Sequence, residues 1–131
     1  MRSWAALIGD GTFSLEVVGV SSCQPELEEI CGGNSRAGEE QQVLAILVPE
    51  QTNPYSPEVV RVQIRRQTVG YLARSDARAL RAWMRRATPS VKRFRCQANI
   101  RRAWDATEKR EYWAVYLNVC LSKDNKNGVD E

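Results

Sequence analysis

The feature that most restricts the fold of this chain is a series of short apolar stretches with strand periodicity, separated by turn-forming residues. Apolar and polar side chains alternate over residues 13–19 and 92–101, and apolar or β-branched runs occupy residues 43–48, 59–64, 68–72 and 112–121. Alternation with a period of two is typical of a strand with one buried face. Arg65-Arg66-Gln67 joins two of the runs, which indicates a hairpin.

Two segments have helical character instead. Residues 24–31 carry Pro25 near the start and glutamates in the first turns, as helices favour. A second helix is predicted to open at Ser75-Asp76, with Ser75 as the N-cap, and to end at Thr88-Pro89. Its core face is expected to comprise Ala77, Leu80, Met84 and Ala87.

About six short strands and two short helices, without the strand–helix–strand alternation of a parallel sheet, predict a β-rich α+β domain. A small OB-like, mainly antiparallel and partly open β-barrel closes such a set of strands most simply. The length of 131 residues fits a single domain over residues 1–121, followed by a disordered tail over residues 122–131. We also expect a cytoplasmic protein with no membrane contact, because the chain has neither a signal peptide nor an apolar run of about 18 residues.

The complete absence of histidine restricts the chemistry of the chain. It excludes Ser–His and Cys–His nucleophiles, an imidazole base and histidine-containing metal sites. The four cysteines, at positions 23, 31, 96 and 120, form no C-x-x-C pair. The sequence also shows neither paired carboxylates nor a glycine-rich phosphate loop. We therefore expect a protein that is not an enzyme and that needs no metal or other cofactor.

The charged residues are distributed very unevenly along the chain. Residues 1–60 carry two basic and nine acidic side chains, whereas residues 61–110 carry fifteen basic and three acidic ones. Arginine dominates the basic block, and its planar guanidinium suits phosphates and base edges. Such a block is typical of a protein with a polyanionic partner. The alternative is a solvated surface that faces the acidic first half of the same chain.

Within the basic block, two sets of arginines follow the predicted elements. Arg74, Arg78, Arg81 and Arg85 have helical spacing, and Arg93, Arg95 and Arg101 share one face of a predicted strand with Gln97 and Asn99. The helical set is more typical of a solvated helix face. Like charges along one strand repel each other, so the strand set calls for a compensating anion or acidic partner.

Three segments, taken in order, resemble the HIRAN domain family. They are Asn53-Pro54-Tyr55-Ser56-Pro57 leading into Glu58-Val59-Val60-Arg61-Val62, then Val69-Gly70-Tyr71-Leu72, and then the helix with Ala77 and Leu80. Val17-Val18-Gly19 is also similar to the family's opening strand, so the resemblance covers residues 13–120. The resemblance implies a compact OB-like barrel that holds the 3′ end of single-stranded DNA.

The resemblance also implies roles for individual residues. Tyr55 matches the tyrosine that helps hold the terminal nucleotides, Asn53 matches the asparagine of the same motif, and Arg74 matches a basic residue that contacts phosphate. Ser56 stands where the family has an aspartate that accepts the 3′-hydroxyl proton, and a serine offers no charge-assisted acceptor there. Ser21-Ser22 replace an arginine and a tyrosine. Without the resemblance, the residues Asn53 to Pro57 favour a rigid turn, and with it they favour a binding loop.

We therefore expect a non-enzymatic module that binds single-stranded nucleic acid, foremost DNA, at an end or along an internal stretch. The candidate contact residues are Asn53, Tyr55, Ser56, Arg65, Arg66, Arg74, Arg78, Arg93, Arg95 and Arg101. The alternative is a protein-interaction or homodimerisation module, because residues 112–121 are apolar on both sides. That last strand is either central in a sheet or covered by a partner.

Overall fold

The strands of the domain form a closed barrel. The structure, a computed structural model, describes residues 4–31, 40–50, 59–87 and 92–120. The strands are β1 (Trp4–Ala6), β2 (Leu15–Val18), β3 (Glu40–Pro49), β4 (Val60–Ile64), β5 (Gln67–Leu72), β6 (Arg93–Asp105) and β7 (Arg110–Leu117). In the order β6-β3-β4-β5-β2-β7 each strand pairs antiparallel with the next, and β7 pairs with β6 to complete the ring.

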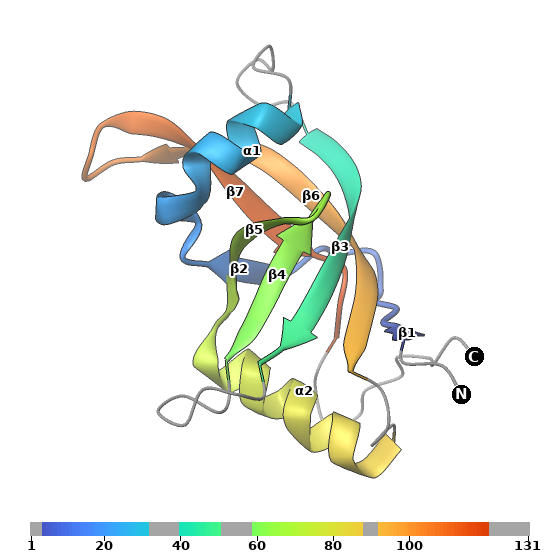
Figure 1. The fold of residues 1–131 in the computed structure, drawn as a ribbon. Coiled ribbons are helices and arrows are strands. Elements are labelled where there is room, and N and C mark those ends of the chain that lie inside the picture. The colour runs from blue at the N-terminus through green and yellow to red at the C-terminus, as the bar shows by residue number, and fades with distance from the viewer. Residues whose placement is uncertain (1–3, 32–39, 51–58, 88–91, 121–131) are drawn as a thin grey trace.

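The predicted small α+β barrel is confirmed, and its ring is closed rather than partly open. Closure depends on β6, whose 13 residues pair with β3 along one edge and with β7 along the other. The predicted strand stopped at Arg101, but β6 continues to Asp105 and forms a projecting hairpin with β7 (Figure 1). β7 is central in the ring, which confirms one of the two alternatives for this strand.

The barrel interior is filled by the apolar side chains of the alternating strands. Leu47, Val62, Phe94, Ile100 and Leu117 are fully buried. Burying each such side chain contributes roughly 1.5–3 kcal/mol. Because Phe94, Cys96, Ala98 and Ile100 point inward, the odd-numbered residues of β6 from Arg93 to Arg101 face outward.

Two helices and one helical turn cover the ends of the barrel. α1 (Gln24–Cys31), preceded by a 3₁₀ turn η1 (Val20–Cys23), lies at one end, and α2 (Arg74–Ala87) crosses the other (Figure 1). The predicted core residues Ala77, Leu80 and Met84 are buried, whereas the side chain of Ala87 lies outside the described part. Trp83 joins them and meets Phe94 edge-on, with ring centroids 5.8 Å apart.

Two details differ from the prediction. Ser75 is not the N-cap, because α2 begins one residue earlier at Arg74 and Ala77 N–H already donates to Ala73 O at 2.9 Å. β1 was not predicted as a strand, since three residues are too few to show a period; it runs parallel to β6, with Ala5 opposite Phe94. No helix in the described ranges is both long and apolar enough to cross a membrane.

Gln24 fixes α1 to the barrel by acting as a short substitute for a neighbouring strand. β7 pairs with β2 only at Tyr116 and Leu117, which leaves the same edge at Trp113 without a strand. There the Gln24 amide accepts from Trp113 N–H at 2.7 Å and donates to Trp113 O at 2.9 Å. The Trp113 ring donates to the Glu28 carboxylate and carries the Arg102 guanidinium 4.3 Å from its centroid.

We predict that Gln24→Ala lowers the free energy of unfolding by about 1–3 kcal/mol, because the part-buried backbone N–H and C=O groups of Trp113 both lose the Gln24 amide as a partner. Denaturant unfolding followed by circular dichroism measures the change. Gln42→Ala, at an exposed position on the outer wall, is the matched control and should alter stability by less than about 0.5 kcal/mol. Equal effects of the two substitutions would contradict the role given to Gln24.

Candidate nucleic-acid interface

A row of arginines on α2 lies beside one rim of the barrel. Arg74, Arg78, Arg81 and Arg85 follow each other at helical spacing, so they share one face of the helix. Arg81 fixes the direction of this face, because its guanidinium donates to Glu50 O and to Val59 O, the latter at 3.3 Å. Glu50 directly follows β3, and Val59 directly precedes β4. The row therefore borders the ends of these two strands.

The outer wall of the barrel adds further arginines at the same end. Arg61 of β4 lies opposite Val48 of β3, and its guanidinium pairs with the Glu50 carboxylate at 3.4 Å. On the far side of β3, Phe94 lies opposite Leu47, which brings Arg93 level with Val48. Neighbouring strands are about 4.8 Å apart, so the Cα atoms of Arg61 and Arg93 are separated by roughly 10 Å.

We call this surface the α2 rim and define it by Arg61, Arg74, Arg78, Arg81, Arg85, Arg93 and Arg95. Arg74, Arg78, Arg85 and Arg93 are exposed, and Arg61, Arg81 and Arg95 are half-buried. Four of the predicted contact residues, Arg74, Arg78, Arg93 and Arg95, thus lie at one end of the barrel. The prediction omitted Arg61, although the inward alternation of Val60, Val62 and Ile64 would have placed it on the outer wall.

Arg65 and Arg66 do not belong to this surface. They form the turn between β4 and β5 at the opposite end of the barrel, with φ angles of 51° and 67°. The length of β4 separates them from the α2 rim by about 16 Å. Arg65 also donates to Ile30 O at 3.0 Å, so its guanidinium caps the end of α1. The structure does not bring these two predicted contact residues together with the others.

Arg101 shares the outer face of β6 with Arg93 and Arg95. Its positive charge is compensated within the chain. It lies eight residues from Arg93, or about 26 Å along the strand. Its Nε is 3.4 Å from Glu40 Oε1, and its guanidinium lies 4.6 Å from the centre of the Tyr116 ring. Asn99 donates to the other oxygen of Glu40 at 3.2 Å. For Arg101, the acidic partner that the strand pattern called for is Glu40.

Asn53, Tyr55 and Ser56 lie outside the described residues. The structure describes the two residues that flank this segment, Glu50 and Val59, whose backbones are joined by a hydrogen bond of 2.9 Å from Glu50 N–H to Val59 O. The backbone carbonyl groups of Glu50 and Val59 both accept hydrogen bonds from the Arg81 guanidinium. The described residues on either side of positions 51–58 therefore lie at the α2 rim.

Two of the tryptophans are core residues: Trp83 and Trp113 are buried. Tyr71 and Trp104 have exposed side chains, and Trp104, on the hairpin between β6 and β7, is 62% exposed. Neither Tyr71 nor Trp104 belongs to the α2 rim.

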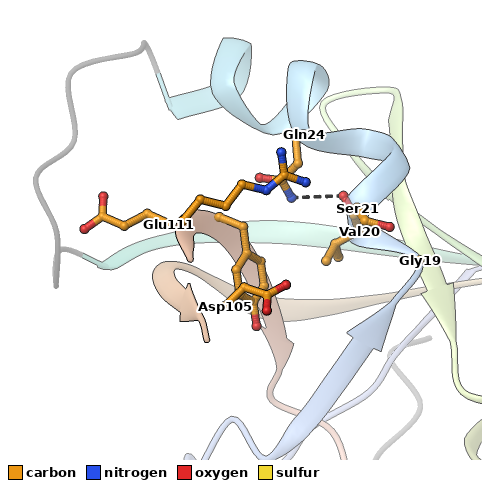
Figure 2. Close-up of a pocket in the computed structure, with 8 residues that line it drawn as sticks. Gly19, Val20, Ser21, Gln24, Asp105 and Glu111 are labelled. Carbon is orange, nitrogen blue, oxygen red and sulfur yellow. Dashed lines mark hydrogen bonds between the residues drawn. The ribbon is translucent and has the colours of Figure 1, made fainter. Parts of the chain in front are cut away.

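A separate depression of about 470 Å³ lies between η1 and the β6–β7 hairpin. Figure 2 shows Gly19, Val20, Ser21 and Gln24 on one side of it and Asp105 and Glu111 on the other. Burial raises the pKa of Tyr112, with Tyr116, Glu16 and Asp105 adding to the effect, so its phenol stays neutral. The carboxylates make this depression a poor phosphate site, although Arg110 also lines it.

Comparison with protein-family models, with curated proteins and with solved structures finds no match to this chain. The resemblance to HIRAN domains stays a prediction that rests on the residues quoted above. Within the described ranges, no group of three or more metal-ligating side chains comes together. The α2 rim is the surface on which seven arginines of the basic block lie, and it is the candidate site.

We predict different effects from removing two neighbouring arginines of α2. Arg81→Met should lower the free energy of unfolding by roughly 1–3 kcal/mol, because Glu50 O loses a donor and Val59 O keeps only the Glu50 N–H. Arg78→Met, one turn away and exposed, should change it by less than about 0.5 kcal/mol. Thermal and denaturant unfolding measure both changes. A larger loss from Arg78→Met would show that the row is not arranged as described.

Proposed function

We propose that this protein is a non-enzymatic module that binds single-stranded nucleic acid, foremost DNA, on the α2 rim. The observation that carries the proposal is the meeting of arginines from β4, α2 and β6 at one end of a closed barrel. Guanidinium groups favour phosphates, and a basic track on a small barrel is suited to a single strand. The proposed setting is the cytoplasm.

The arrangement also favours a phosphate chain over a compact anion. Arg61 and Arg93 lie roughly 10 Å apart across the strands, and the α2 row spans three turns of the helix, or about 16 Å. A ligand must be extended and carry repeated charge to reach all of them. The resemblance of residues 53–62 to HIRAN domains supports the same assignment, because Glu50 and Val59, the described residues on either side of positions 51–58, lie at this rim.

We predict that binding of an oligothymidylate of about 12 nucleotides weakens steeply with salt. For about three neutralised phosphates the slope of log affinity against log salt is near −2, which is roughly a 20-fold loss between about 50 and 200 mM. Fluorescence anisotropy measures the slope. Affinity that does not change with salt would contradict the proposal.

Charge reversal at the two ends of the barrel locates the site. Arg78→Glu and Arg93→Glu should each lower affinity by about 5- to 10-fold and make the salt slope shallower. Arg66→Glu changes the net charge equally at the opposite end of the barrel, on an exposed turn residue. It should leave affinity within about twofold of the parent protein. Equal losses from all three variants would contradict a site at the α2 rim.

We predict nearly equal affinities for oligonucleotides with free and blocked 3′ ends. The rim arginines contact the backbone, which is the same at an end and inside a strand, and Ser56 offers no charged acceptor for a terminal hydroxyl. A ribose version of the same oligonucleotide compares RNA with DNA. A strong preference for the free 3′ end would show that recognition depends on the terminal hydroxyl rather than on the rim.

The alternative proposal is a protein-interaction or homodimerisation module. The apolar character of both faces of β7 no longer requires a partner, because the strand is central in the ring and the Arg101 guanidinium lies over Tyr116 on its outer face. What favours the alternative is the exposed Trp104 on the projecting hairpin. Light scattering of the parent protein and of Trp104→Ala distinguishes a monomer from a dimer that uses this residue.

A further inference from the structure

An exposed apolar depression adjoins the α2 rim on the outer wall of β6. Its volume is about 270 Å³, and Ala6, Ile8, Leu44, Arg95, Gln97 and Asn118 are among the residues that line it. Ile8 is 60% exposed and Leu44 is 56% exposed. Two large aliphatic side chains that line one depression and remain in water on a polar wall indicate a contact surface.

The position of Ile8 is fixed by the chain around it rather than left to a free terminus. Leu7 N–H donates to Arg95 O at 2.8 Å, and Gly11 N–H donates to Asn118 Oδ1 at 2.8 Å. Between them, Gly9 lies so close to Asn118 that a Cβ atom would come within 2.3 Å of the Asn118 side chain. The segment is thus held against β6 with Ile8 turned outward.

The same network orients the polar edge of the depression. Asn118 Nδ2 donates to Gln97 Oε1 at 3.2 Å, and Asn118 N–H donates to Gln97 O at 2.9 Å. Because the Gln97 oxygen accepts from Asn118, its amide NH₂ group is the end turned to solvent, where Gln97 is exposed. An amide donor of this kind suits an acceptor atom on a base edge.

We propose that this depression receives a nucleobase of the strand whose phosphates lie on the α2 rim. Ile8 and Leu44 pack against the base, the Gln97 amide donates to one of its acceptors, and Arg95 contacts the adjoining phosphate. Charge decides the class of occupant, because the described residues that line the depression include Arg95 and no acidic side chain. Arg93 lies two residues away on the same face and joins the depression to the rim.

This assignment rests on the proposed function, and its test separates the two. Leu44→Gln and Ile8→Gln should each lower the affinity for the oligothymidylate about 5- to 10-fold at constant salt, because a base loses apolar contact area. The salt slope should stay the same, because no phosphate contact is lost. An oligonucleotide with abasic sites in place of its bases should bind the parent and the two variants equally.

Val18→Gln is the matched control, since Val18 is 42% exposed on β2, away from β6. It should leave affinity unchanged, and unfolding experiments check that all variants fold.

Unchanged binding by Leu44→Gln with a normal salt slope would overturn the base site and leave the proposed function standing. Loss of a dimer in Leu44→Gln, detected by light scattering, would show that a second copy occupies the depression and would also overturn it. If the parent protein shows no salt-dependent binding, the proposed function itself is wrong.

Discussion

The pairing of β6 with two neighbours at once is the constraint on which the rest of the structure depends. Its 13 residues hydrogen-bond to β3 and β7 and thereby close the ring, while β1 adds to its first residues. Phe94 and Cys96 are buried inside the closed barrel. Because side chains alternate between the two faces of a strand, Arg93, Arg95 and Gln97 must point outward. The outer surface that we assign to ligand binding is therefore fixed by the packing of the core.

The arginines of the basic block lie at both ends of the barrel. At the α1 end, Arg65 caps a helix, Arg101 meets Glu40, and Arg102 lies over Trp113 and 3.6 Å from Glu111. At the α2 end, the guanidinium groups of Arg61 and Arg81 contact the side chain and the backbone of Glu50. The strand register thus divides the basic block into a set at the α1 end and a set that forms the α2 rim.

Much of this fold was predictable from sequence, because alternation and helical spacing are local signals. The bounds of α1 and the hairpin around Arg65-Arg66 are confirmed, and so is the burial of Leu80 and Met84. The division of the arginines was not predictable, because it depends on strand register. Only pairing across the ring shows that Arg101 meets Glu40 and that Arg66 lies a strand length from Arg74. The roles of Gln24 and Ile8 also depend on contacts between distant residues, which no periodicity records.

The central claim is that a single nucleic-acid strand lies along the α2 rim and the start of β6. Backbone amide shifts of the full chain, recorded by NMR during titration with a short oligothymidylate, test it most directly. The account predicts that the largest changes fall on residues 74–85 of α2 and 93–97 of β6, with residues 65–67 and 105–110 nearly unaffected. Changes centred on those two turns, or spread evenly over the whole barrel, would contradict it.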